Sequence, residues 1–337
     1  MASPVAGCLA LAGAVSALLG IPAGLANRLA KIALFCSSLP ATSHVLRAAA
    51  TYARYGSGYR DTARSYLGGP GGRFELVHSL RDEITQSFRT APLFALAVLL
   101  TLGVTAIIGL MVFLMVVLKH GFMGMTHGTD PSHRVHDLTF GFLFGVTVMG
   151  LLAQLRRPWA NVAGMVMALI PWGGLLLAGI LSADVYRVMV INPSRLVAPA
   201  TVVTALLHPT GRAFFRSFSV SRVNWAMLAL AIIASVPLLA FTAVNIRLQR
   251  TVPDDHAAMG HYGFMAAFGF TVIGASLLAS LRPDGWRLTA WIAGVLPTLL
   301  GLISLAYPGN ASSLSRAWAL AAIAWGILFI VVTELTQ

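Results

Sequence analysis

Long apolar runs recur along this chain of 337 residues, and each is long enough to cross a membrane as a helix. A transmembrane helix needs about 20 apolar residues to span a hydrocarbon core of about 30 Å. Charged residues make up only 10% of the chain, against about a quarter in soluble domains. The sequence therefore predicts an all-α integral membrane protein with about eight to nine transmembrane helices. The clearest runs cover residues 93–118, 138–155, 160–181, 225–244, 263–281, 288–306 and 318–332.

Two of these runs resemble each other. Residues 136–158 read HDLTFGFLFGVTVMGLLAQLRRP, and residues 261–283 read HYGFMAAFGFTVIGASLLASLRP. Each begins with His and ends with Leu-Arg and a nearby Pro. Repeats in membrane proteins commonly place a site at the boundary between the copies. We therefore expect two tandem, parallel three-helix repeats, which cover residues 93–182 and 225–307.

The segments outside the repeats complete the predicted organisation. Residues 1–39 begin with an apolar run that no basic residue precedes, which favours an uncleaved membrane anchor over the alternative of a cleaved secretory signal. Residues 40–92 are rich in Arg and Tyr and carry one apolar stripe, which predicts a cytoplasmic amphipathic helix lying at the membrane interface. Residues 183–224 form a connector, and residues 308–337 contain the final transmembrane helix.

The connector decides the topology. Its apolar run at 196–207 is short, with Pro193 and Pro199 near its start. If this run crosses the membrane as a broken helix, the two repeats lie parallel and most basic residues face the cytoplasm. The positive-inside rule favours that arrangement. We therefore expect a multi-pass protein of the cell (inner) membrane, with its N-terminus outside and its C-terminus cytoplasmic.

The formal net charge of +12 does not predict nucleic-acid binding. Basic residues retained on the cytoplasmic side orient membrane proteins and meet anionic lipid, so the expected partner is the lipid bilayer. No acidic residue lies near the middle of a predicted span, which argues against an ion-coupled transporter. The sequence also lacks a Walker loop, a nucleophile elbow and a His-Glu-x-x-His motif.

Histidines gather in two polar loops that the predicted topology places on the outer face. Four of the nine histidines lie within residues 120–136, and two more lie within residues 256–261. Imidazole and thioether donors together suit copper, whereas imidazole with carboxylates suits zinc. The acidic residues of these loops are candidates for outer-shell partners of the imidazoles. The predicted metal ligands are His127, His133, His136, His256, His261, Met125 and Met259.

Haem is a second interpretation of the same residues. His136 and His261 hold equivalent positions at the start of membrane helices, and glycines follow each of them. Such a pair could supply two axial ligands, although the chain has no Cys-x-x-Cys-His attachment motif. In a third interpretation the histidines bind nothing, and they cap helices together with Asp137 and Asp255.

One short string resembles a known family. His136, Phe140, Gly141 and Phe142, followed by an apolar run, are similar to the His-led helices of NnrS-type haem- and copper-containing membrane proteins. The likeness covers one helix, which ends near Leu155. The chain departs from that family in its length and in its other segments. The resemblance implies haem or copper at such a helix and assigns the chain to no family.

These observations predict a His/Met-rich site that binds copper or haem for electron transfer or metal handling. They leave open whether the protein is an enzyme, and no catalytic residue is predicted. One alternative is a non-catalytic subunit or assembly partner of a larger membrane complex, with residues 40–92 as the contact to partner membrane subunits. Another is a channel or facilitator for a small solute, which the repeat and the broken segment suggest.

Overall fold

A computed structural model describes residues 85–86, 89–118, 133–156, 158–211 and 222–336. These residues belong to one compact unit, Glu83–Gln337. The predicted anchor, residues 1–39, and nearly all of the interfacial segment, residues 40–92, lie outside the described residues. The interpretation of residues 40–92 as a contact with partner subunits therefore stays a prediction.

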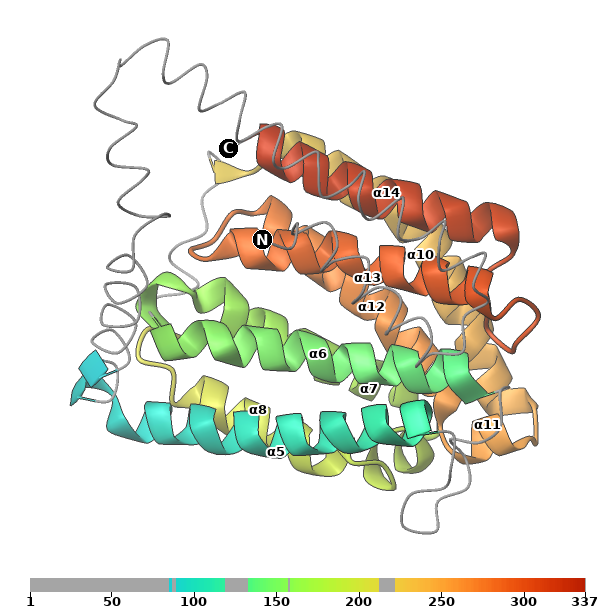
Figure 1. The fold of residues 1–337 in the computed structure, drawn as a ribbon, viewed down its shortest axis with the longest axis horizontal. Helices are drawn as coiled ribbons and strands as arrows, with labels where there is room; N and C mark the ends of the chain where they lie inside the picture. Colours follow the sequence, from blue (N-terminus) through green and yellow to red (C-terminus); the bar gives the residue numbers. More distant parts are fainter. Residues whose placement is uncertain (1–84, 87–88, 119–132, 157, 212–221, 337) are drawn as a thin grey trace, which may run out of the picture. The chain divides into compact units, whose positions relative to one another are not determined.

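Helices make up nearly all of the described chain, and no strand occurs in it (Figure 1). Seven of them are long and apolar enough to cross a membrane. They match the predicted spans to within about one helical turn, except that one runs seven residues further, to Thr251. The all-α prediction is confirmed for the described residues, and the seven helices are consistent with a multi-pass membrane protein. They are α5 (Pro92–Leu118), α6 (Arg134–Arg156), α7 (Val162–Leu181), α10 (Trp225–Thr251), α12 (His261–Ser280), α13 (Trp286–Ala306) and α14 (Arg316–Leu335).

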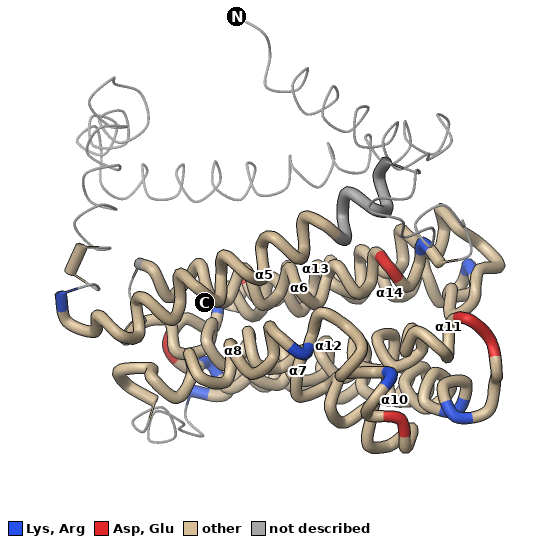
Figure 2. Tube along the Cα trace, turned by 90° about the horizontal axis from the view of Figure 1, so that it is seen from below, with Lys and Arg blue, Asp and Glu red and all other residues tan. Residues whose placement is uncertain are grey.

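Helix α12 is the central helix of this bundle. Its apolar stretch is 78% buried, against 22% for those of α10 and α14. It packs against α6, α7, α10 and α13. Small residues permit this: the hydroxyl of Thr242 in α10 lies where a side chain at Gly269 would be. The outer helices expose apolar side chains instead, as contact with lipid requires, and most of the tube in Figure 2 carries no charge.

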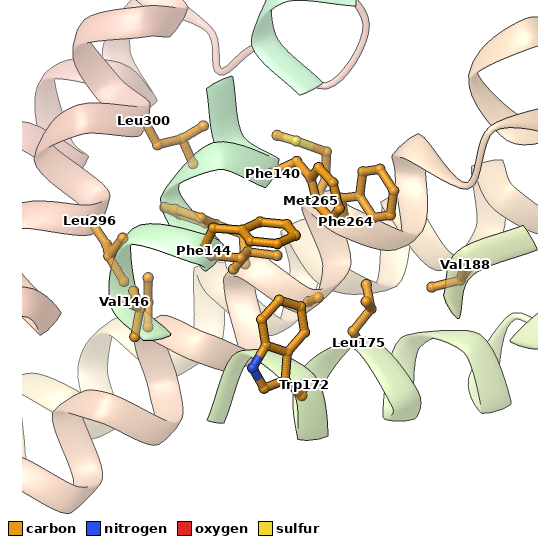
Figure 3. Close-up of a cluster of buried hydrophobic side chains, with 14 of the residues drawn as sticks. Phe140, Phe144, Val146, Trp172, Leu175, Val188, Phe264, Met265, Leu296 and Leu300 are labelled. Atoms are coloured by element: carbon orange, nitrogen blue, oxygen red, sulfur yellow. The ribbon is translucent and has the colours of Figure 1, made fainter. Parts of the chain in front are cut away.

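Aromatic rings pack between α6 and α12 within about the first three turns of the two helices (Figure 3). Phe140 of α6 stacks on Phe264 of α12, with ring centroids 4.0 Å apart. Phe144 meets the ring of Trp172 in α7 edge-on at 5.2 Å. This packed cluster fixes the first turns of α6 and α12 beside each other.

Helices α6 and α12 run in the same direction. Their first turns meet, and the loops that follow them also meet, because the Ala163 amide donates to the Asp284 carbonyl at 3.0 Å. Beside these loops, Arg222 forms an ion pair with Asp284 at 3.0 Å. One end of the bundle thus carries His136 and His261, and the opposite end carries the loops that follow α6 and α12.

The connector forms an interrupted helical segment. A π-helical turn, η4 (Tyr186–Val190), precedes α8 (Ser194–Leu206), which contains Pro199. At one end, Val188 packs where a side chain at Gly263 would lie; at the other, His208 Nε2 lies 3.1 Å from Gln154 Oε1 near the end of α6. The segment therefore extends from the histidine-bearing end to the opposite end, although α8 alone is only about 20 Å long.

Candidate metal centre

Four histidines converge at one end of the bundle from two distant parts of the sequence. His133 directly precedes α6, and His136 lies in the first turn of that helix. His256 lies in the one-turn helix α11 (Asp255–Ala258), and His261 is the first residue of α12. The parallel packing of α6 and α12 brings these two groups together.

Local sequence explains how α11 presents His256. The carboxylate of Asp254 begins α11 by accepting a hydrogen bond from the Ala257 amide at 2.8 Å. Gly260 then turns the chain into α12 with a φ of 75°. A larger residue is excluded there twice over, by the left-handed backbone and by Arg187, whose carbonyl oxygen would lie 2.5 Å from an added Cβ.

Three of the imidazoles have the spacing of a metal site. The candidate ligand nitrogens of His133, His256 and His261 all lie within 4.8 Å of one another. The two Nδ1 atoms of His133 and His261 are 3.2 Å apart. Two imidazole nitrogens on one tetrahedral ion, each about 2.0–2.1 Å from it, would be about 3.3 Å apart. The observed separation therefore fits two ligands of one ion.

His136 packs against this triad. Its ring centroid lies 4.6 Å from that of His256 and 5.3 Å from that of His261. The Nδ1 atoms of His136 and His256 are both buried, and neither has a hydrogen-bond partner among the described residues. Buried polar atoms are rarely left unpaired, because the lost hydrogen bond to water costs about 1–3 kcal/mol.

A carboxylate and a phenol flank the imidazoles. Asp137 Oδ1 lies 4.0 Å from His261 Nε2, and the Tyr262 hydroxyl donates to Asp254 Oδ2 at 2.7 Å. Partial burial would raise the pKa of Asp254. The hydrogen bonds from Ala257 and Tyr262 and the neighbouring His256 outweigh that effect and hold the pKa below its ordinary value.

Sequence reasoning missed the polar residues that hold the site in place. Gln249 of α10 donates to the Ala257 carbonyl at 2.7 Å and to Asp184 Oδ2 at 2.9 Å, and it accepts from the Gly263 amide at 3.3 Å. It thereby ties α11 to the start of α12. Asn245 lies four residues earlier on the same face of α10. Two polar residues at that spacing in an apolar helix were the signal available in the sequence.

The structure brings four of the predicted ligands together: His133, His136, His256 and His261. The predicted ligands Met125 and His127 lie outside the described residues. Met259 ends α11, and its carbonyl accepts a hydrogen bond from Asn192 at 3.3 Å. A role for its sulfur stays a prediction.

The capping alternative is only partly matched by the structure. Asp137 lies in the first turn of α6, as expected of a residue that stabilises a helix N-terminus. Asp255 instead lies in the first turn of α11. Gly260 occupies the N-cap of α12, and it has no side chain that could cap the helix. Capping therefore does not explain why His256 and His261 lie together.

Comparison of the chain with protein families, with characterised proteins and with solved structures finds no match. The chemistry of the four histidines is therefore the basis for assigning a function.

Proposed function

We propose that this protein is a multi-pass membrane protein that holds a transition-metal ion between His133, His256 and His261, for electron transfer or metal handling. The observation that carries the proposal is the convergence of three imidazole nitrogens within 4.8 Å of one another. The three residues come from three separate segments: His133 directly precedes α6, His256 lies in α11 and His261 begins α12.

The surroundings of His261 support the proposal. Its Nδ1 lies toward His133, while its Nε2 lies 4.0 Å from Asp137. Histidines that bind metals usually donate their second ring N–H to a carboxylate, which fixes the tautomer and makes the ligand more basic. Asp137 is placed to accept from His261 in this way after a small movement.

Copper is the first candidate for the ion. Imidazole binds copper in both oxidation states, and Cu²⁺ forms the most stable complexes of the divalent first-row ions. A redox-inert ion such as Zn²⁺ would fit the same donors and would point to metal handling rather than electron transfer.

The geometry favours an ion over haem. Axial imidazoles of one haem iron approach it from opposite faces of the macrocycle. The rings of His136 and His261 instead lie face to face, with an interplanar angle of 25°. The Val188 side chain fills the space beside Gly263. No gap for a macrocycle separates the two rings in this arrangement.

The proposal includes the predicted repeats, α5–α6–α7 and α10–α12–α13, in parallel orientation. The equivalent residues His136 and His261 stack on each other across α6 and α12, and Phe140 stacks on Phe264 beside them. The third helix of each unit contains a proline, at Pro171 and Pro297. With the interrupted connector as a further crossing, the histidines lie at the outer face and the C-terminus in the cytoplasm.

Metal titration of the detergent-purified chain tests the proposal. We expect the protein, stripped with a chelator, to bind one Cu²⁺ with nitrogen hyperfine coupling in its electron paramagnetic resonance spectrum. His256→Gln and His261→Gln should each weaken binding at least tenfold, about 1.4 kcal/mol, because each removes a ligand. His208→Gln is the matched control, since His208 lies at the opposite end of the bundle.

Equal copper affinity in all of these variants would contradict the proposal. A stoichiometric haem absorption band that disappears in His136→Gln would show that the cofactor is haem and not a metal ion held by the histidines alone. Wild-type protein that takes up neither copper nor zinc nor haem would leave no cofactor role for the histidines.

A further inference from the structure

Ser312, in the loop between α13 and α14, connects the histidine cluster to α10. Asn245 Nδ2 donates to the Phe241 carbonyl at 2.9 Å, so Asn245 Oδ1 is the end of the amide that accepts. The Ser312 hydroxyl donates to this oxygen at 2.6 Å. Ser312 Oγ also lies 3.2 Å from His136 Nε2.

These contacts determine the tautomer of His136. A serine hydroxyl has one hydrogen, and Ser312 gives it to Asn245. Its oxygen can therefore only accept from His136, so Nε2 of His136 carries the proton. The neutral ring then has its lone pair on Nδ1. That atom is buried, the side chain is fully inaccessible to solvent, and Nδ1 has no hydrogen-bond partner among the described residues.

The backbone of Ser312 is strained where it makes these contacts. Its φ is 63°, a left-handed conformation that residues other than glycine rarely adopt. Such strain persists only where the surrounding structure holds it, commonly at functional sites. A glycine would avoid the strain but would supply no hydroxyl to His136.

We propose that His136 Nδ1 is a fourth ligand of the metal ion, and that Asn245 and Ser312 are positioning residues that keep its lone pair directed to the ion. This inference rests on the proposed three-histidine site. Four imidazoles complete a tetrahedral shell and leave no open position for a substrate. The ion therefore serves electron transfer or metal holding, and it does not activate a bound substrate.

Zn²⁺ affinity and the number of nitrogen ligands from X-ray absorption test the inference. We expect four nitrogen ligands in the wild type and three in His136→Gln, with affinity lowered about 10–100-fold. Ser312→Gly should lower affinity about tenfold, the usual minimum for an outer-shell partner. Its metal-free form should unfold at the same temperature or higher, because glycine accepts the backbone conformation. If Ser312 had only a structural role, Ser312→Gly would not lower the Zn²⁺ affinity while leaving the metal-free protein equally stable.

Ser313→Ala is the matched control, since the neighbouring hydroxyl donates to the Tyr307 carbonyl at 2.9 Å in the same loop. It should leave Zn²⁺ affinity unchanged. Two results would show that His136 is not a ligand: three nitrogen ligands in the wild type, or unchanged affinity in both His136→Gln and Ser312→Gly. Either result would leave the three-histidine site intact. A wild-type protein that binds no ion would overturn both.

Discussion

His208 differs from His136 and His256 of the candidate centre because both of its ring nitrogens have hydrogen-bond partners. Its Nδ1 accepts from the amide and the hydroxyl of Thr210, each at 3.2 Å. Its Nε2 therefore carries the proton and donates to Gln154 Oε1 at 3.1 Å. The Nδ1 atoms of His136 and His256 have no such partner among the described residues. The contrast supports a packing role for His208 and a binding role for His136 and His256.

The environment of His208 predicts how stability depends on pH. Burial lowers the pKa of His208 from 6.5 to about 4, and the Pro158 carbonyl opposes this only in part. Between these two values the unfolded chain binds the proton and the folded chain does not. Stability should therefore rise as the pH increases from about 4 to about 6.5, by up to about 3 kcal/mol, and level off above that.

Thermal unfolding of metal-free protein at pH 4.5 and pH 7 measures this effect. His208→Gln has no imidazole to protonate, so its difference between the two pH values should be smaller than that of the wild type. The four clustered histidines are the same in both proteins, so any contribution from them cancels in the comparison. An identical pH dependence in the two proteins would show that His208 is not the group responsible.

At the scale of elements, glycines allow α13 and α14 to pack closely. A Cβ added at Gly294 would lie 2.6 Å from the Gly326 carbonyl oxygen, and one added at Gly301 would lie 2.5 Å from the Ala319 carbonyl oxygen. Close contact through small residues is how membrane helices associate, because lipid gives no hydrophobic force between them. The last two long helices are thus held by backbone proximity.

Gly294→Ala should destabilise the protein by about 1–3 kcal/mol, since the α14 backbone must move away to admit a methyl group. Gly173→Ala in α7 is the matched control, because nothing lies within 4 Å of the added Cβ there. Alanine also favours a helix over glycine, so the control should be neutral or slightly stabilising. Thermal midpoints in detergent compare the two, and equal destabilisation would argue against close α13–α14 packing.

At the scale of the whole molecule, hydropathy predicted the helices well. The thickness of a membrane sets the length of each span and its apolar interior sets the residue types, so both can be seen in the local sequence. The histidine cluster was also predictable in part, since His133, His136, His256 and His261 lie in two loops that the repeat relates. Ser312 could not be predicted in this way. Its role depends on a strained turn and on contacts with α6 and α10, and neither leaves a pattern in the sequence.

The same direction of α6 and α12 limits how many times the chain can cross the membrane between these two helices. If both helices span the membrane, they start on the same side, so the number of crossings between the end of α6 and the start of α12 must be odd; α7 and α10 supply two of them. The proposed parallel repeats therefore require the connector to supply a third crossing, although α8 is too short to cross alone. The π-helical turn η4 and Pro199 interrupt the connector. Side chains of the same segment satisfy backbone carbonyls at the interruption, because Asn192 donates to the Arg187 carbonyl and Ser194 to the Met189 carbonyl.

Cysteine labelling in intact cells tests this crossing, with the two native cysteines replaced by serine. Ile191→Cys and Asp255→Cys, at the histidine-bearing end, should react with an impermeant reagent added outside. Pro209→Cys and Asp284→Cys, at the opposite end, should react only after the membrane is permeabilised. All four positions are exposed on the protein. Reaction of Pro209→Cys from the outside would mean that the connector does not cross, and the two repeats could then not lie parallel in the membrane.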